Sequence, residues 1–178
     1  MVAEIDFQRL VEEFHMPLYR FALSLSRRES DAMDLTQQTF YLWALKGHQL
    51  REPSKVKTWL FTTLYREFLG TVRRDDRFVE TDEGLLLAEP AHIDSTVVNQ
   101  LDAGVVQKAL LQLDEKFRAP LALFYLEQHS YREIAEILEV PIGTVMSRIS
   151  RGKAELRKQL TDASERAARK VVPWKEVS

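Results

Sequence analysis

The stretch SYREIAEILEVPIGTVMSRISRGKAELRKQL, at positions 130–160, decides the fold of this chain. Its apolar residues recur at helical spacing in a short run up to Leu138 and in a longer run after Pro141. Pro141 prevents the first helix from continuing, and Thr144 is placed to cap the second. The pattern predicts a helix-turn-helix whose two helices are held together by apolar side chains: Ile134, Leu138, Val140, Val145 and Ile149.

The second helix of this motif is strongly basic. Against Glu155 alone it carries Arg148, Arg151, Lys153, Arg157 and Lys158. Such a charge suits the major groove of DNA, and Ser147, Arg148 and Arg151 lie in the half that reaches base edges in helix-turn-helix docking. An arginine at such a position is able to donate two hydrogen bonds to a guanine base. Basic helical hairpins are also often only solvated surfaces, so the charge pattern alone leaves both interpretations open.

Helical spacing also governs the first part of the chain. Apolar residues form one stripe from Phe7 to Leu25, with Asp6 as the expected N-cap and Pro17 expected to kink or divide the helix. Positions 48–57, HQLREPSKVK, show no period and predict a loop, after which a helix resumes near Thr58.

The segment DAMDLTQQTFYLWAL, at 31–45, predicts a helix with two distinct faces, capped by Ser30 and ended by Gly47. The predicted buried face consists of Ala32, Leu35, Thr36, Thr39, Phe40 and Trp43. The predicted polar face consists of Asp34, Gln37, Gln38 and Tyr41.

Positions 75–102 separate two folded parts, because they hold eight acidic side chains and a single basic one, Arg77. Helical spacing returns between Val105 and Tyr125. We therefore expect an all-α fold of two small helical domains joined by a flexible acidic linker, the second domain containing the helix-turn-helix. The expected boundaries are 1–76, 77–102 and 103–161, followed by an extension of unknown role at 162–178.

Composition excludes several classes of protein. The chain has no cysteine, so disulfides and thiol chemistry are excluded, and its four histidines lack the spacing of metal ligands. No phosphate-binding glycine loop or nucleophile motif occurs, so we expect no catalytic residue, no metal site and no cofactor. Without a signal sequence or an apolar run of about 18 residues, we expect a cytoplasmic protein with no membrane insertion.

Two of these segments together resemble one known family. The run IAEILEVPIGTVMSRISRGKAELR, at 134–157, is similar to the minus-35-reading domain of extracytoplasmic-function (ECF) sigma factors. DAMDLTQQTFYLW, at 31–43, looks like their polymerase-docking segment, and WLFTTLYREFLGTVRR, at 59–74, takes the place of their minus-10 helix. The resemblance implies a non-catalytic factor that binds the clamp helices and flap of core RNA polymerase and promoter DNA, and that an anti-sigma factor holds inactive.

The resemblance also assigns roles to individual residues. For minus-35 DNA it implies Thr144, Met146, Ser147, Arg148, Arg151 and Lys153. For the minus-10 region it implies Lys55, Tyr65, Arg66, Arg73 and Arg74. For core polymerase it implies Asp34, Gln37 and Gln38.

The chain departs from the family pattern at three places. Arg66 and Gly70 stand where the family usually has Asn and Asp, so a minus-10 preference does not transfer. Glu139 stands where many members have Gly, and since a positive φ would strain it by roughly 1 kcal/mol, we expect a turn that avoids that conformation. Met146 replaces a common basic residue. Two alternative functions remain, a stand-alone helix-turn-helix regulator and a sigma-like decoy that no longer melts DNA.

Overall fold

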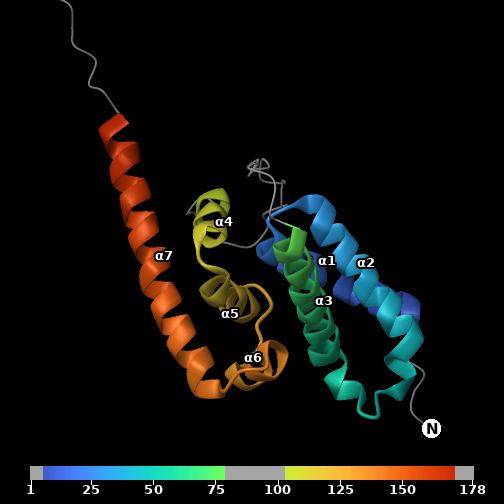
Figure 1. The fold of residues 1–178 in the computed structure, drawn as a ribbon. Coiled ribbons are helices and arrows are strands. Elements are labelled where there is room, and N and C mark those ends of the chain that lie inside the picture. The colour runs from blue at the N-terminus through green and yellow to red at the C-terminus, as the bar shows by residue number, and fades with distance from the viewer. Residues whose placement is uncertain (1–5, 79–102, 171–178) are drawn as a thin grey trace, which may run out of the picture.

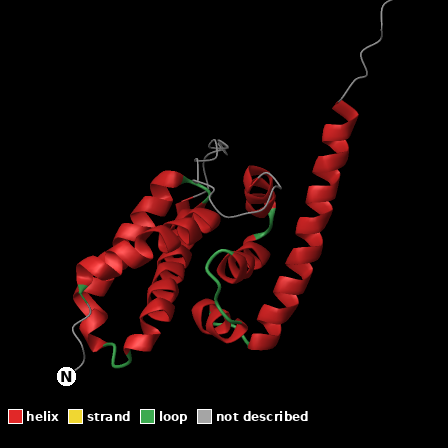
Figure 2. Cartoon of the chain, turned by 180° about the vertical axis from the view of Figure 1, so that it is seen from behind, coloured by secondary structure: helices red, strands yellow, loops and turns green. Residues whose placement is uncertain are grey.

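The computed structural model describes residues 6–78 and 103–170, and all regular structure in these two ranges is helical (Figure 1, Figure 2). The helices form two groups, one within residues 6–78 and the other within residues 103–170. The prediction of an all-α fold with two helical domains is confirmed. Positions 79–102, which hold most of the predicted acidic linker, lie outside the described residues.

The first domain consists of α1 (Phe7–Ser26), α2 (Glu29–Lys46) and α3 (Val56–Phe78). The 3₁₀ turns η1 (Gly47–Gln49) and η2 (Pro53–Lys55) lie between α2 and α3, so the segment predicted as a loop contains two short turns. Aromatic pairs fill the space between the helices, because large rings bury much apolar area and pack edge to face.

Helix α1 begins where the sequence predicted. The carboxylate of Asp6 accepts a hydrogen bond from the backbone N–H of Gln8 at 3.0 Å, which confirms it as the N-cap. Pro17 lies inside α1 and does not divide it, so of the two alternatives, a kink or a division, the division is wrong. Leu10 and Phe21, on either side of Pro17, are both buried, and this packing outweighs the single backbone hydrogen bond that a proline removes.

Helix α2 has the two faces that its sequence predicted. All six residues of the predicted buried face are buried, and Asp34, Gln37, Gln38 and Tyr41 are exposed. The predicted cap is wrong, because the helix begins at Glu29 and the Ser30 hydroxyl donates to the Asp31 carboxylate instead. Two acidic residues in the first turn favour this start, since they complement the helix dipole.

Gly47 follows the last residue of α2, as predicted, but for a different reason. Its backbone is right-handed, so no left-handed cap is needed. A Cβ at Gly47 would lie 2.6 Å from two ring atoms of Trp43. Trp43 in turn packs edge to face on Trp59 of α3, with ring centroids 5.1 Å apart. Gly47 is therefore required by the packing of the tryptophan.

The second domain contains α4 (Ala103–Gln112), α5 (Glu115–Tyr125), α6 (Tyr131–Leu138) and α7 (Ile142–Lys170). Helices α5 and α6 pack against the first part of α7, α4 packs against it further along, and the end of α7 extends beyond α4 (Figure 1). Gly152 allows the close contact with α5, because a Cβ there would lie 2.8 Å from Leu121 Cδ1 and 3.1 Å from Phe117 Cβ. The helix continues past position 161, where the sequence placed the end of the domain.

The two domains pack against each other, with α1 and α3 of the first against α5 and α6 of the second (Figure 1). Arg118 of α5 lies buried in this contact, where its guanidinium donates to the carbonyl oxygens of Leu113 and Leu25. Burial, and then the charge of nearby Arg27, lower the pKa of Arg118 to about 10. Arg27 also donates to the Leu113 carbonyl, at 3.1 Å.

Candidate nucleic-acid interface

The helix-turn-helix begins with a capping box at Ser130. The Ser130 hydroxyl accepts from the Glu133 N–H at 3.3 Å, and the Glu133 carboxylate accepts from the Ser130 N–H at 2.7 Å. Burial acts to raise the pKa of Glu133, but the hydrogen bonds from Ser130 outweigh it and lower that pKa. This reciprocal pair fixes the start of α6, because it satisfies two backbone donors that the helix itself leaves free.

The turn between α6 and α7 holds Glu139 in the left-handed conformation, with φ 56° and ψ 43°. The expectation that the turn avoids this conformation is wrong. Only three residues separate the two helices, and the reversal is closed by the Val140 N–H donating to the Ala135 carbonyl at 3.1 Å. The chain thus adopts at a glutamate a conformation that favours glycine.

Behind the turn, the predicted packing is confirmed. Ile134 and Leu138 of α6 are buried with Val145 and Ile149 of α7, and Val140 is half-buried against them. The predicted role of Thr144 as a cap is wrong. Helix α7 already begins at Ile142, and the Thr144 N–H bonds to the Pro141 carbonyl within the first turn.

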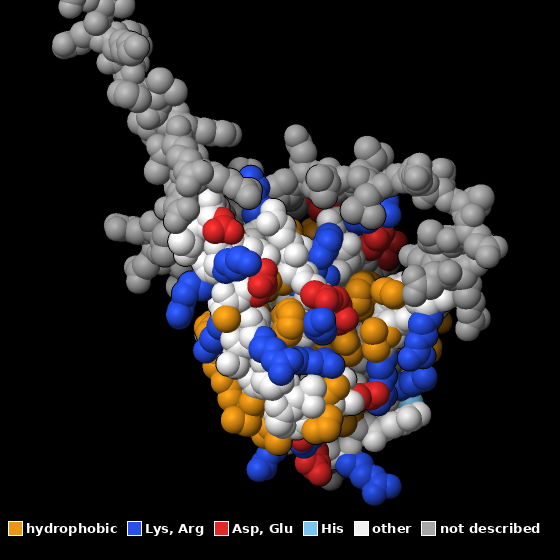
Figure 3. Space-filling model, turned by 60° about the vertical axis from the view of Figure 1, so that its left-hand side comes forward, with side chains coloured by type: hydrophobic (Ala, Val, Ile, Leu, Met, Phe, Trp, Pro, Cys, Tyr) orange, Lys and Arg blue, Asp and Glu red, His pale blue; other side chains and the backbone are white. Residues whose placement is uncertain are grey.

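The residues predicted to read minus-35 DNA all lie on α7, but they do not form one surface. Ser147 and Arg151 share the outward face and are exposed. Arg148 is half-buried on the flank toward the first domain. Its positive charge there acts to lower the pKa of Tyr65, against the larger effects that raise it. Figure 3 shows lysine and arginine side chains standing out over this side of the molecule, with hydrophobic side chains between them.

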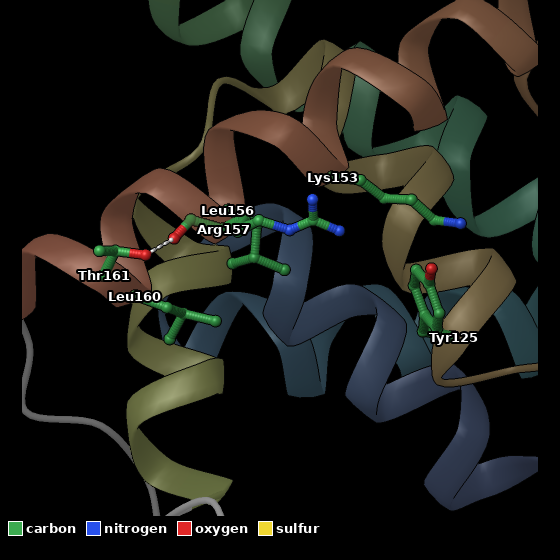
Figure 4. A pocket seen from close by; sticks show the side chains of 6 residues that line it. All are labelled: Tyr125, Lys153, Leu156, Arg157, Leu160 and Thr161. Carbon is green, nitrogen blue, oxygen red and sulfur yellow. Dashed lines mark hydrogen bonds between the residues drawn. The ribbon is translucent and has the colours of Figure 1, made fainter. Parts of the chain in front are cut away.

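Lys153 lies on the opposite flank of α7, where it contacts α5. Its ammonium is 5.6 Å from the ring centroid of Phe124 and 5.3 Å from that of Tyr125. The nearby Tyr125 side chain raises the pKa of Lys153. Lys153 and Tyr125 line a pocket of about 560 Å³ together with Leu156, Arg157, Leu160 and Thr161 (Figure 4). The cation is thus placed over aromatic rings rather than on the face that carries Ser147.

The residues predicted to act at minus-10 lie on α3 and the turn before it, and three of them contact the second domain. Lys55 pairs with Glu136, Arg66 pairs with Glu139, and the Tyr65 hydroxyl donates to the Glu115 carboxylate at 2.9 Å. Tyr65 is only 7% exposed, and burial, followed by the charge of Glu115, raises its pKa. In this arrangement its ring is covered by protein.

The other two minus-10 residues lie toward the end of α3. Arg73 is exposed, and Arg74 lies in the helix but its side chain is outside the described residues. A hollow of about 400 Å³ lies between α2 and α3 and includes Trp59 and Arg66 in its lining. The sequence predicted a loop before α3, but nothing in the local pattern indicated this hollow.

The predicted polymerase-binding residues, Asp34, Gln37 and Gln38, are exposed along α2. The same helix also exposes Tyr41, which was predicted on this face, and two large apolar side chains that were not predicted to be exposed, Met33 and Leu45. A mixed apolar and polar exposed strip of this kind is typical of a surface that binds a partner.

Within residues 6–78 and 103–170, no group of three or more His, Asp or Glu side chains is placed to hold a metal ion. The helices in the same two ranges include none that is long and apolar enough to cross a membrane.

Both domains match known protein families. Residues 10–78 match the model of Sigma-70 region 2, and residues 103–156 match that of Sigma-70, region 4. The chain is 32% identical over 144 residues to the ECF RNA polymerase sigma factor EcfG of Rhodopseudomonas palustris, covering 78% of this chain and 76% of EcfG. The chain belongs to the ECF RNA polymerase sigma factors.

Two further sigma factors are similar to this chain, one in sequence and one in both sequence and fold. The chain is 34% identical over 167 residues to SigE of Mycolicibacterium smegmatis, covering 92% of this chain and 65% of SigE, so it spans just under two thirds of that relative. RpoE of Bartonella quintana, solved in complex with the anti-sigma factor NepR, superimposes with a TM-score of 0.76 at 32% identity, over 88% of this chain and 97% of RpoE.

Proposed function

We infer that this ECF sigma factor directs core RNA polymerase to specific promoters, with the region 4 domain reading minus-35 DNA and the region 2 domain opening the minus-10 region. The observation that carries this function is the helix-turn-helix on a domain that matches Sigma-70, region 4, with Ser147 and Arg151 exposed on the outward face of α7. The factor acts in the cytoplasm, where the polymerase is, and the polymerase carries out the chemistry.

For minus-35 recognition, Ser147 and Arg151 contact base edges, because they lie on the exposed face of the first turns of α7. Arg157 and Lys158, further along the helix, attract phosphates without reading sequence. Met146 is exposed beside them and offers an apolar surface to a thymine methyl group. Arg148 and Lys153 act from the flanks of the helix.

For polymerase binding, the exposed strip of α2 supplies Asp34, Gln37 and Gln38 as polar contacts and Tyr41 as an apolar one. The solved relative RpoE of Bartonella quintana is in complex with the anti-sigma factor NepR. We accordingly propose that an anti-sigma factor also regulates this chain.

The test is run-off transcription from a promoter library with core polymerase, with and without the protein. We expect protein-dependent start sites that share a minus-35 sequence. Arg151→Ala should relax selection of one base pair of that sequence, a loss of about 1–3 kcal/mol in discrimination, while affinity for core polymerase is retained. Arg28→Ala, an exposed arginine on the first domain, is the matched control and should leave selection unchanged.

Core binding without protein-dependent start sites would overturn the proposed function and favour the decoy. Equal loss of core affinity and promoter selection in Arg151→Ala would show that α7 is not the recognition helix. A palindromic site bound by a dimer without polymerase would instead favour the stand-alone regulator.

A further inference from the structure

Apart from Arg118 of the second domain, the charged side chains at the contact between the two domains are divided by sign. The first domain contributes five basic side chains: Arg20, Arg27, Lys55, Lys57 and Arg66. The second domain contributes carbonyl oxygens and four carboxylates: Glu115, Glu127, Glu136 and Glu139. Such complementarity fixes the orientation in which two surfaces meet.

The centre of the contact is buried. Glu127, which follows α5, has a side chain only 3% exposed and receives two hydrogen bonds from the Arg20 guanidinium, at 3.0 and 3.2 Å. The Lys57 ammonium donates to the Glu127 carbonyl at 2.7 Å. Beside them the ring of His129 packs edge to face on Phe61, with centroids 4.6 Å apart. A carboxylate buried this deeply requires the partner that the other domain supplies.

At the edge of the contact, α6 and its turn reach the residues proposed to act at minus-10. The Lys55 ammonium lies 3.3 Å from the Glu136 carboxylate, and Arg66 Nε donates to Glu139 Oε1 at 2.7 Å. Glu139 is the residue held at positive φ in the turn. Glu139 thus occupies a conformation that favours glycine, and its carboxylate binds Arg66. Strained backbone positions of this kind are concentrated at functional sites.

We propose that the helix-turn-helix domain inhibits the first domain directly, with Glu136 and Glu139 taking the positions that promoter phosphates would occupy beside Lys55 and Arg66. The inference rests on the proposed function, since it takes Lys55 and Arg66 to be minus-10 residues. The free factor is then closed, and its region 2 domain binds the melted strand only after the two domains separate.

Polymerase is able to dock on the closed form. The exposed strip of α2 faces away from the contact, which is made by α1 and α3 with α5 and α6. A partner that holds the region 4 domain elsewhere would then shift the population toward the open form, because a ligand shifts an equilibrium by its preference for one state. The device makes promoter opening depend on polymerase.

Three variants of the full chain separate the possibilities. Glu136→Gln/Glu139→Gln removes the two carboxylates at the edge of the contact, and Arg20→Gln breaks its buried centre without touching a residue assigned to DNA. Glu12→Gln/Glu13→Gln makes the same change of charge on the exposed side of α1 and serves as the control. Because the chain has no cysteine, Arg9→Cys/Lys158→Cys places one dye on each domain for energy transfer and leaves the control positions free.

We expect high energy transfer in the free protein and in the control charge variant, and lower transfer in the two interface variants and on adding core polymerase. Binding of a fluorescent single-stranded minus-10 oligonucleotide should strengthen about tenfold in both interface variants, as expected if about one free molecule in ten is open. The control charge variant should bind like the parent.

Low energy transfer in the free parent would overturn the proposal, as would opening of the domains without any gain in oligonucleotide binding. An equal gain in the control variant would also overturn it, because net charge alone would then explain the effect. Run-off transcription distinguishes failure of the proposed sigma function from failure of the closed contact between the domains. Variants that open and bind the strand, yet direct no initiation with polymerase, would leave the closed contact established and refute the sigma activity.

Discussion

Arg20 and Glu127, which are 107 positions apart in the chain, form a two-point ion pair that joins the two domains of this ECF sigma factor. Burial raises the pKa of Glu127, and the hydrogen bonds and charge of Arg20 oppose that rise. The nearby charge of Lys57 also lowers this pKa, so the charged state of the Glu127 carboxylate depends on basic side chains of the other domain.

Replacing Arg20 by leucine should lower the free energy of unfolding by about 2 kcal/mol. Removal of one member of a buried pair costs about 3–5 kcal/mol, and we expect less here because the Arg20 side chain is 32% exposed and water partly screens it. Urea denaturation followed by circular dichroism measures the change. Arg28→Leu, which breaks an exposed pair with Asp31, should change stability by less than about 0.5 kcal/mol. Equal effects of the two variants would contradict the buried role of the pair.

Local patterns in the sequence were sufficient to predict the helices and their faces. The buried face of α2 and the packing of Ile134 against Ile149 both follow from residues within a few turns of each other. The helix starts were shifted by two residues at Ser30 and by three at Thr144, because several nearby residues are able to satisfy the first turn.

The contact between the domains was not predictable from the sequence. Arg20 and Glu127 each resemble an ordinary surface charge when only their neighbours in the chain are considered. The conformation of Glu139 was missed for a related reason. The turn is set by how α6 and α7 must cross, and the carboxylate contact with Arg66 comes from a separate domain.

Acid should destabilise the protein between about pH 6.5 and pH 4 through His129. Burial, and then the charge of Lys57, lower the pKa of His129 to about 4, while Glu133 acts in the opposite direction. The unfolded chain takes up its proton near the ordinary value of about 6.5, so within this window it binds more protons than the folded chain. The free energy of unfolding is therefore not reduced by His129 above about pH 6.5, and it falls as the pH is lowered from there to about 4.

The measurement is the free energy of unfolding as a function of pH. The slope should reach about 1.4 kcal/mol per pH unit from this group alone, and His129→Gln should remove that part of the slope. Titration of Glu127 affects parent and variant alike, so it cancels in the comparison. Identical slopes for the two proteins would show that His129 does not stay neutral in the folded state.

Glu139→Gly and Glu139→Ala should differ in stability although both remove the same carboxylate. At φ 56° a glycine has no Cβ penalty, whereas alanine keeps it, so the glycine variant should be more stable than the alanine variant by about 1 kcal/mol. Thermal unfolding of the two variants measures this difference directly. If they melt together, the turn is not strained at this position.

Gly152→Ala and Gly143→Ala should change stability in opposite directions, although both glycines lie in α7. A Cβ at Gly152 would meet Leu121 and Phe117 at 2.8 and 3.1 Å, and because Leu121 is fully buried it cannot move aside. We expect a loss of about 1–3 kcal/mol from overpacking. A Cβ at Gly143 meets nothing within 4 Å, so the higher helix propensity of alanine should add up to about 1 kcal/mol. Urea denaturation of both variants compares the two effects, and a stabilising Gly152→Ala would show that α5 and α7 do not pack as closely as described.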